Sequence, residues 1–391
     1  MRLVRLSLTD FRNYRSLELA LPPTPYVIFY GDNAQGKTNL LEAVAVLAAT
    51  RSPRATIERE LIGWDAVPRV ARLYGEVARA ADSVAIEVAL REDDAPGELA
   101  DGEAGHRLQK RIRVNGVPRR AADAIGELLA VMFAPEDIGL VSGTPSLRRR
   151  CLDLLCSQLD RAYGRALQRY QRLVEQRNFL LRLIRDHRAA VDELAFWDEQ
   201  LVALGAGLLR GRLAALAGIG PLAETVHLGL SSGAERLSLD YRMTIGAGDN
   251  DIEGRFREAL RRLQPREIGA GASLIGPHRD DFSFVAHGER GESAAGVDLG
   301  TYGSRAQQRT AALSLRLAEA RLLKATRGDA PVLLLDDVLS ELDQGRRRYL
   351  LAAAEGFDQV LFTATDLSVF DARLREAAVA MRVERGTVQP D

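Results

Sequence analysis

The sequence predicts an α/β fold into which a mainly helical second lobe is inserted. Short apolar, β-prone runs near both ends of the chain adjoin helical patterns, as expected of a mostly parallel sheet covered by helices. Between them, residues 145–217 are rich in arginine, leucine and glutamine, and their apolar residues recur at helical spacing. With 391 residues the chain exceeds one ordinary hydrophobic core, so we expect two lobes.

The elements expected in the N-terminal part are mostly strands. Residues 1–90 have the pattern of strands around one helix. Residues 92–105 are acidic and glycine-rich, which is typical of an exposed hairpin loop. Residues 111–117 predict a strand that runs into a turn at Asn115 and Gly116.

From residue 145 onward we expect first helices and then a mixture of strands, loops and helices. Residues 145–217 predict two long helices that form a hairpin, with its turn near residues 185–191. Strand-like and loop patterns return from residue 221 to 300. A helix is then predicted at residues 305–327, followed by buried strands at residues 331–337 and 359–365.

Composition narrows the class of protein. Hydrophobic residues make up 46% of the chain and charged residues 27%, as in globular proteins, and no run approaches the roughly 18 apolar residues of a membrane span. The N-terminus alternates like a strand and lacks the apolar core of a signal peptide, so we expect a cytoplasmic protein without a membrane partner. Cys151 and Cys156 lie in a helical pattern and are interpreted as buried thiols.

The charge is locally uneven, although the net charge is only −1. Residues 145–188 hold eleven arginines against four acidic residues. Arg148, Arg149 and Arg150 stand together at the start of a predicted helix, where they either contact nucleic-acid phosphates or pair with acidic residues. Both interpretations stay open, and the three arginines are candidate DNA contacts.

Eight residues match the phosphate-binding pattern G-x-x-x-x-G-K-[ST]. An apolar run at residues 26–30 precedes them and a helical pattern follows, which is the strand–loop–helix context that this loop requires. In such a loop, backbone N–H groups face the phosphates, the lysine reaches the β- and γ-phosphates, and the hydroxyl holds Mg²⁺. The predicted ATP phosphate site consists of Gly31, Asp32, Asn33, Ala34, Gln35, Gly36, Lys37 and Thr38.

The second part of this site is predicted at the end of an apolar strand. Asp336 and Asp337 follow four apolar residues, as the carboxylates on the Mg²⁺ side of P-loop ATPases do. We expect Asp336 to hold Mg²⁺ together with Thr38. Asp337 is the candidate that orients or deprotonates the attacking water, and it forms the predicted catalytic pair with Lys37.

A third motif indicates an ABC-type ATPase. Ser304, Arg305, Ala306 and Gln307 open a predicted helix where ABC-type ATPases carry a Ser-Gly-Gly-Gln signature. A helix N-terminus with a serine hydroxyl suits a γ-phosphate, and in that class it meets the ATP that the other subunit binds. Ser340 and Asp343 resemble the dimer-contact loop of the class.

These motifs set the expected domain boundaries. The P-loop and the carboxylates lie far apart in the sequence, which points to a large insertion rather than a small GTPase. We assign residues 1–140 and 265–391 to an ABC-type ATPase lobe and residues 141–264 to an inserted helical arm.

At this point the chain resembles the RecF family over nearly its whole length. Beyond the P-loop, the resemblance rests on residues 11–14, 133–137, 276–281 and 304–309. The run Gly-Pro-His-Arg-Asp-Asp at 276–281 and the run Ser-Arg-Ala-Gln-Gln-Arg at 304–309 are far more specific than the P-loop, which many families share. RecF proteins are similar to the head domains of SMC ATPases with a shortened helical arm, so the resemblance implies an SMC-head-like lobe.

The resemblance also implies a function and partners. It implies ATP and Mg²⁺ as cofactors, an ATP-dependent homodimer, and binding of single- and double-stranded DNA at gap junctions. It further implies cooperation with RecR and RecO in loading the RecA recombinase, and weak, DNA-stimulated hydrolysis of ATP to ADP and phosphate.

Several positions depart from the expected patterns. Ala306 stands where the family usually has glycine, and its methyl group is expected to crowd the γ-phosphate held by the partner. No histidine follows the last buried strand, so Thr365 or Asp366 is the candidate for the switch residue of transporter-type ATPases. Glu136 is the candidate for their loop glutamine.

The run at 276–281 has its own interpretation. His278 beside a proline is most simply a structural hydrogen-bonding residue, and residues 279–281 are interpreted as an ion-paired turn that braces the ATP site. Two alternatives to the DNA-binding function stay open. One is the ATPase subunit of a membrane transporter, and the other is a nucleotide-binding scaffold that does not hydrolyse ATP.

Overall fold

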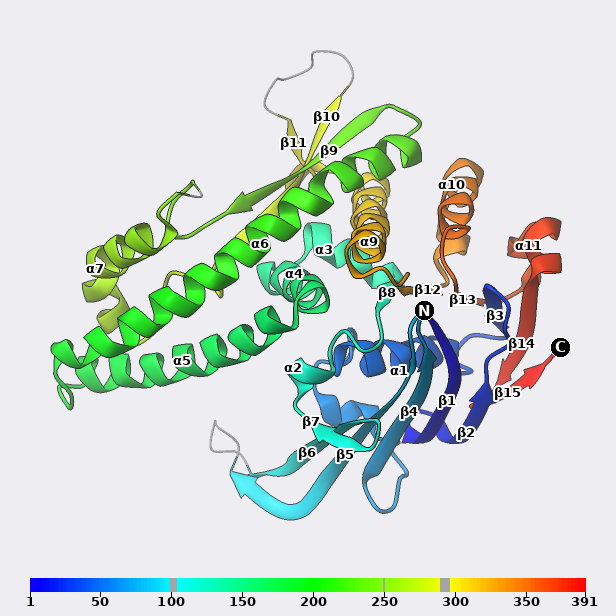
Figure 1. Cartoon of the computed structure of the whole chain (residues 1–391), viewed down its shortest axis with the longest axis horizontal. Helices are drawn as coiled ribbons and strands as arrows, with labels where there is room; N and C mark the ends of the chain where they lie inside the picture. The colour runs from blue at the N-terminus through cyan, green and yellow to red at the C-terminus, as the bar shows by residue number, and fades with distance from the viewer. Residues whose placement is uncertain (99–103, 249, 289–295) are drawn as a thin grey trace. The chain divides into compact units, whose positions relative to one another are not determined.

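The computed structural model describes residues 1–98, 104–248, 250–288 and 296–391. The chain divides into two compact units, coloured along the sequence in Figure 1: the first consists of Met1–Glu136 and Glu319–Asp391, and the second of Asp137–Ala318. Residues 265–318, which the sequence assigned to the ATPase lobe, therefore belong to the second compact unit. The functional division at residues 141 and 264 stays a prediction.

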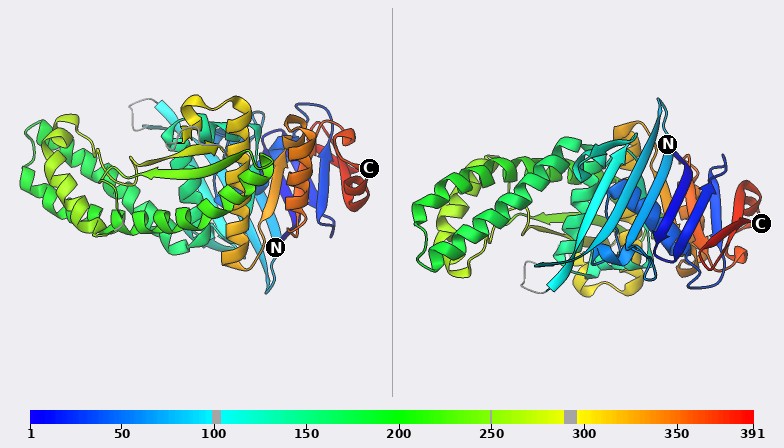
Figure 2. Two further views of the ribbon diagram at one scale, coloured as in Figure 1. Left: turned by 90° about the horizontal axis from the view of Figure 1, so that it is seen from above. Right: turned by 90° about the horizontal axis from the view of Figure 1, so that it is seen from below.

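An antiparallel sheet forms one layer of the first unit, with strand order β2-β1-β4-β5-β6-β7. Asn115 and Gly116 both have positive φ between β6 and β7, as the predicted two-residue turn requires. Residues 99–103, within the predicted loop at 92–105, lie outside the described residues. The strands, seen from below in Figure 2, are β1 (Arg2–Phe11), β2 (Tyr14–Ala20), β4 (Val70–Ala78), β5 (Ser83–Glu98), β6 (Ala104–Val114) and β7 (Val117–Arg119).

A mostly parallel sheet forms another layer of this unit, with strand order β15-β14-β3-β13-β12-β8. Helix α1 (Lys37–Ala49) contacts strands of both sheets, and its residues from Leu40 to Ala49 are all buried. A helix that is apolar all round needs such a position between two layers. The strands are β3 (Tyr26–Tyr30), β8 (Ala130–Phe133), β12 (Val332–Asp336), β13 (Val360–Ala364), β14 (Ala378–Glu384) and β15 (Thr387–Pro390).

The strand order of the parallel sheet positions the candidate site. Strand β13 lies between β3, which precedes the P-loop, and β12, which ends at Asp336. Parallel register then sets Asp336 beside Thr363. The short helices of the first unit are η1 (Glu58–Leu61), α2 (Ala121–Ala124), η4 (Val338–Glu341), α10 (Gln344–Ala354), η5 (Leu367–Val369) and α11 (Ala372–Ala377), and η2 (Pro135–Asp137) ends at its boundary.

The second unit contains a helical hairpin with its turn near the predicted place, but the prediction of two helices over residues 145–217 is wrong in part, because a separate helix covers residues 145–159. Helices α5 (Arg161–Arg185) and α6 (Leu194–Leu230) pack side by side, as Figures 1 and 2 show, and the turn between them contains η3 (Val191–Glu193). Near this turn, Leu181 and Leu194 belong to a buried apolar cluster. The other elements are α3 (Ile138–Ser142), α4 (Pro145–Leu159), α7 (Ile252–Ala270), α8 (Leu299–Tyr302), β9 (Glu235–Arg242), β10 (Asp281–Gly288) and β11 (Val297–Asp298). Helix α9 (Arg305–Arg327) begins in this unit and belongs to the first unit from Glu319 onward.

The expectation of strands and loops from residue 221 to 300 is wrong in part. Strands β9, β10 and β11 do form a small sheet, but α6 continues through Pro221 and α7 contains Pro265. Proline is a strong signal for the end of a helix because it lacks an N–H group. In α6 the buried residues Ile219, Ala223 and Val226 continue the same packed face past the proline, so burial outweighs the lost hydrogen bond.

One stretch of the described residues, Val191–Leu230, is long and apolar enough to cross a membrane by length and composition alone. This differs from the expectation that no such run exists. Within the second unit, α6 packs against α4, α5, α7 and β9, and its buried residues include Arg212 and His227. Both side chains have polar partners, which is the environment of a core helix in a folded unit.

The two cysteines lie on α4. Both are buried thiols that are not joined in a disulfide, as predicted. Burial raises the pKa of Cys156 to about 12, so this thiol stays protonated near neutral pH.

Candidate functional site

The P-loop joins β3 to α1 in the first unit. Gly31 and Gly36 have φ angles of 146° and 113°, which residues with a side chain rarely adopt. A Cβ atom at Gly31 would collide with the carbonyl group of Val383, and one at Gly36 with the side chain of Asn13. Residues 32–34 at the tip of the loop are exposed. The backbone is therefore open to a ligand on its outer side and tightly supported on its inner side.

Lys37 and Thr38 begin α1 directly behind the loop. The Lys37 Nζ atom donates to the carbonyl oxygens of Gly31 at 2.6 Å and Asp32 at 2.7 Å. Burial lowers the pKa of Lys37, and the nearby carboxylates of Asp337 and Asp336 oppose this shift. The ammonium group is thus held against the loop backbone, at the place where a P-loop lysine reaches phosphates.

Asp336 is the centre of a small hydrogen-bonded group. Its Oδ1 atom accepts hydrogen bonds from the hydroxyl groups of Thr38 at 2.8 Å and Thr363 at 2.7 Å. Burial raises the pKa of Asp336, and the two hydroxyl donors oppose the rise. The P-loop and the carboxylate strand, far apart in sequence, therefore meet through a direct contact.

Thr363 belongs to the candidate site by its contacts, and the sequence analysis missed it. Besides donating to Asp336, its Oγ1 atom accepts the backbone N–H of Asp337 at 2.9 Å. Asp337 itself has φ 48°, a left-handed backbone that is unusual for a residue with a side chain. Only the register of β12 and β13 brings Thr363 to both aspartates, and the sequence motif by itself gives no such signal.

The run at residues 11–14 supports the P-loop from behind. Tyr14, fully buried, donates its hydroxyl to the carbonyl of Gly36 at 3.0 Å, and Asn13 donates to the carbonyl of Gln35 at 3.0 Å. The Asn13 side chain also accepts from Asn39 at 2.8 Å. These contacts fix the backbone of the loop before any ligand arrives.

Arg12 of the same run supports α1. Its guanidinium makes a two-point contact with the carboxylate of Glu42, at 2.8 and 3.0 Å, and Glu42 is fully buried. Ser52 donates a further hydrogen bond to this carboxylate. A buried charge needs such partners, so this part of the motif stabilises the helix that carries Lys37 and Thr38.

The predicted signature forms the N-terminus of α9 in the second unit. Ser304, Arg305 and Ala306 are exposed. The Ser304 N–H donates to the side-chain oxygen of Gln307 at 2.9 Å, and the Gln307 N–H donates to the Ser304 hydroxyl oxygen at 3.3 Å. This reciprocal pair is a capping box, and it leaves the start of the helix open to solvent. The crowding expected from Ala306 stays a prediction.

The predicted dimer loop follows the two aspartates in the first unit. Ser340 and Asp343 are both exposed. Ser340 donates to the carbonyl of Asp337 at 2.7 Å, and Asp343 caps α10 by accepting the N–H of Arg346 at 2.9 Å. The loop is thus hydrogen-bonded to the residue that follows β12, and its contact with a partner subunit stays a prediction.

The run at residues 276–281 joins several elements of the second unit. His278 contacts the hydroxyl of Tyr170 at 2.8 Å and the carbonyl of Ser273 at 3.3 Å, and burial lowers its pKa to about 4. Its role is therefore structural, as interpreted from the sequence. The described contacts of this run lie within the second unit, so its bracing of the ATP site stays a prediction. Arg212 donates to the Pro277 carbonyl at 2.6 Å, and Tyr241 donates to Asp280 at 3.0 Å.

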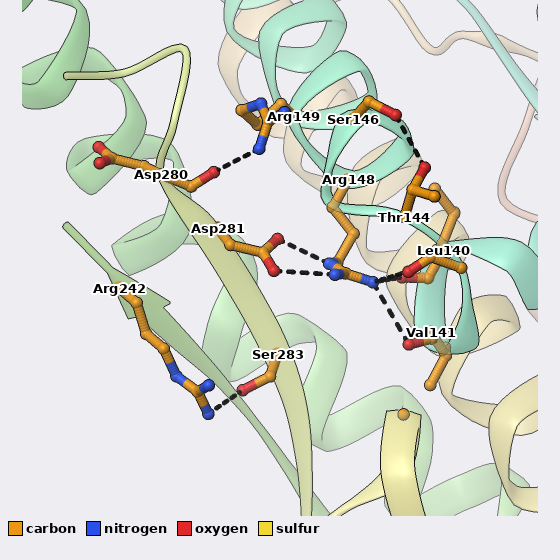
Figure 3. A network of polar contacts seen from close by, with 12 residues as sticks. Leu140, Val141, Thr144, Ser146, Arg148, Arg149, Arg242, Asp280, Asp281 and Ser283 are labelled. Atoms are coloured by element: carbon orange, nitrogen blue, oxygen red, sulfur yellow. Dashed lines mark hydrogen bonds and ion pairs between the residues drawn. The ribbon is translucent and has the colours of Figure 1, made fainter. Parts of the chain in front are cut away.

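The three candidate DNA contacts lie at the start of α4, and Figure 3 shows two of them, Arg148 and Arg149. Arg148 makes a two-point ion pair with Asp281, at 2.7 and 2.8 Å, and donates to the Gly143 carbonyl at 2.8 Å. Arg149 donates to the Asp280 carbonyl at 2.9 Å, and Arg150 is exposed. For Arg148 the structure thus has the acidic pairing that the sequence left open. The DNA contacts stay a prediction.

The remaining candidates for switch and loop residues lie near the strand ends. Thr365 and Asp366 follow β13 and are exposed, and Asp366 caps the next short helix by accepting the N–H of Ser368 at 2.6 Å. Glu136 is exposed and lies 3.7 Å from Arg54. Their roles stay predictions.

The residues present fit a Mg²⁺ ion bound with ATP. The Thr38 hydroxyl and the Asp336 carboxylate converge at 2.8 Å, and both offer the oxygen atoms that this cation prefers. Among the described residues there is no cluster of three or more histidine, cysteine, aspartate or glutamate side chains that would hold a metal ion. The two oxygens therefore suit an ion whose other ligands are phosphates and water.

The fold and the site together define an ATPase fold of the ABC and SMC-head type. In a solved SMC head bound to the C-terminal winged-helix domain of ScpA, the fold is similar with a TM-score of 0.53 at 12% identity, over 100% of this chain and 97% of that one. Because the identity is so low, this similarity concerns the fold alone. The chain matches no family model.

Similarity to RecF proteins is much stronger and extends over the full length. The chain is 46% identical over 399 residues to the DNA replication and repair protein RecF of Chloroflexus aurantiacus, covering 98% of each chain. It is 37% identical over 395 residues to RecF of Listeria monocytogenes, covering both chains completely. A solved structure of the recombination mediator protein RecF with ATP, in the RecFOR pathway, has a TM-score of 0.85 at 31% identity over 100% of this chain and 97% of that one.

The chain therefore belongs to the RecF family of DNA replication and repair proteins. The similarities give no support to a membrane-transporter subunit or to a non-hydrolysing scaffold.

Proposed function

We propose that this protein is an ATP-dependent DNA-binding protein of recombinational repair. The observation that carries the proposal is the contact between Thr38 of the P-loop and Asp336 of the carboxylate strand, in a chain that matches RecF proteins from end to end. A solved RecF structure contains ATP, and the residues of the P-loop have the backbone that phosphate binding needs. ATP is thus the ligand that the site supports best.

The phosphates of ATP would lie along the outer side of the P-loop. Lys37 would exchange its contacts with the loop carbonyls for the β- and γ-phosphates. Mg²⁺, held by Thr38 and Asp336, would neutralise phosphate charge. Asp337 would orient the attacking water, giving slow hydrolysis of ATP to ADP and phosphate that DNA stimulates.

ATP would also join two copies of the chain. In this proposal the exposed start of α9, with Ser304, Arg305, Ala306 and Gln307, faces the γ-phosphate bound by the partner copy. Ser340 and Asp343 would contact the partner beside the same site. Hydrolysis would remove the γ-phosphate and so release the dimer.

The closed dimer would clamp DNA where a single-strand gap meets duplex. Family membership supports this substrate and supports work with RecR and RecO in loading RecA, in the cytoplasm and without a membrane partner. The candidates for phosphate contacts are Arg148, Arg149 and Arg150 at the start of α4, of which Arg148 also pairs with Asp281.

Sedimentation velocity with ATP, ADP and no nucleotide tests the dimer. We expect wild-type chains to associate with ATP alone. Lys37→Ala should lose nucleotide binding altogether, because it removes the cation that meets the phosphates. Ser304→Arg should keep ATP binding to the monomer and lose the dimer. ATP-induced dimers that survive Ser304→Arg would remove the proposed role of the signature.

A further inference from the structure

A chain of hydrogen bonds extends from the signature to strand β9. The side-chain oxygen of Gln307 accepts the Ser304 N–H at 2.9 Å, so it closes the capping box. The nitrogen of the same amide donates to the Oε1 atom of Glu235 at 2.6 Å. Gln307 therefore links Ser304, which caps the N-terminus of α9, to Glu235, the first residue of β9.

The carboxylate of Glu235 decides which way this amide points. An amide has a donor end and an acceptor end, and a carboxylate accepts only. If the Gln307 amide were flipped, its oxygen would face the Glu235 carboxylate and its NH₂ group would face the Ser304 N–H. Both contacts would be repulsive, so Glu235 selects the orientation that closes the cap.

Glu235 is itself held in place by the end of α6. Its backbone N–H donates to the Ser231 hydroxyl at 3.3 Å, and that hydroxyl donates to the Glu235 carbonyl at 3.2 Å. Its Oε2 atom lies 3.5 Å from the Nε2 atom of His227, which is fully buried on α6. The other ring nitrogen of His227 contacts Ser314 of α9 at 3.0 Å. The backbone of Glu235 is thus held at the end of α6, and its carboxylate lies between His227 of α6 and Gln307 of α9.

We propose that Glu235 is a positioning residue for the signature, acting through Gln307. With the amide held, the Ser304 oxygen accepts the Gln307 N–H, and this contact leaves the hydroxyl hydrogen for another acceptor. That hydrogen and the first N–H groups of α9 are what an incoming γ-phosphate would meet. This inference rests on the proposed function, because the phosphate contact belongs to the ATP-driven dimer.

Hydrogen exchange of the first turn of α9 tests the positioning without any dimer. In Glu235→Ala we expect the amides of Ser304, Gln307 and Gln308, which donate hydrogen bonds in this turn, to exchange about tenfold faster, the factor that the loss of one hydrogen bond to a charged group allows. Glu235→Gln, which keeps an acceptor, should restore most of the protection. Glu224→Ala is the matched control, because Glu224 on α6 pairs with Arg236 next to Glu235 and its carboxylate is not the one that Gln307 contacts. Unchanged exchange in Glu235→Ala would overturn the inference.

The dimer gives the second arm of the test. Glu235→Ala should weaken ATP-driven association about tenfold and leave ATP affinity of the monomer unchanged, and Glu235→Gln should recover association. On a Gln307→Ala background, Glu235→Ala should add no further loss, whereas additive losses would show that Glu235 does not act through Gln307. If wild-type chains fail to associate with ATP, the proposed function falls, while the exchange experiment still decides whether Glu235 orders the cap.

Discussion

Replacement of Thr363 by valine tests the part of the site that only the fold reveals. Valine has nearly the shape of threonine and places a methyl group where the hydroxyl stood, so the change leaves no cavity but removes the hydrogen-bonding group. That hydroxyl donates to the Asp336 carboxylate at 2.7 Å and accepts the Asp337 N–H at 2.9 Å. Thr363→Val therefore breaks two hydrogen bonds in the centre of the candidate ATP site.

The expected cost follows from these two contacts. A hydrogen bond to a charged group contributes about 1.5–3 kcal/mol, and a buried N–H left without an acceptor costs about 1–3 kcal/mol. Asp336 keeps the Thr38 hydroxyl, so the loss at the carboxylate is partial. We expect Thr363→Val to lower the free energy of unfolding of the first unit by about 3 kcal/mol.

Native-state hydrogen exchange of β12 measures this loss in the first unit alone, because protected strand amides exchange through unfolding of their own unit. Thr365→Val is the control, since Thr365 is exposed and lies two residues along the chain. Its unfolding free energy should stay within about 0.5 kcal/mol of wild type. A Thr363→Val protein as stable as this control would refute the role assigned to the hydroxyl.

Two further predictions concern the second unit. Arg177 is fully buried and donates to Asp198 and Glu267 at 2.7 Å each, so Arg177→Met should destabilise this unit by about 3–5 kcal/mol by leaving the buried Glu267 carboxylate short of a partner. Hydrogen exchange of the α5 amides measures this loss of stability. The double variant Arg177→Met with Glu267→Leu should recover part of it. An unchanged free energy of unfolding of the second unit in Arg177→Met alone would contradict the argument. Burial lowers the pKa of His278 from 6.5 to about 4, so the unfolded chain binds a proton in that range that the folded chain does not. The contribution of His278 to the free energy of unfolding is therefore complete above pH 6.5 and is lost as the pH falls to 4, by about 3 kcal/mol in total. The urea midpoint of His278→Gln should fall less than that of the wild type over this pH range. Parallel curves of urea midpoint against pH for the two proteins would argue against this account.

The residues of the candidate nucleotide site can be proposed from the sequence because each motif is local in the chain. A P-loop lies between one strand and one helix, and the carboxylates end one apolar strand, so each motif carries its own structural context. Thr363 has no such local context in the sequence. It reaches Asp336 and Asp337 through the pairing of two parallel strands, and pairing between strands is a property of the fold.

Arginines show the same limit. The sequence does not distinguish among Arg148, Arg149 and Arg150. In the structure Arg148 forms an ion pair with Asp281, on a strand far along the chain, and Arg150 is exposed. Proline gives a local signal that the fold can override. Pro221 is a local signal against helix, but the packed face of α6 continues past it because long-range burial is worth more than one backbone hydrogen bond.

The measurement that tests the central claim most directly is DNA binding by fluorescence anisotropy, on gapped and on plain duplex, with ATP, with ADP and without nucleotide. Moderate salt is needed because phosphate contacts weaken steeply as salt rises. The account predicts that binding tightens with ATP alone, and more on gapped than on plain DNA. Equal binding in all three nucleotide states would contradict it, because the ATP site would then be uncoupled from DNA.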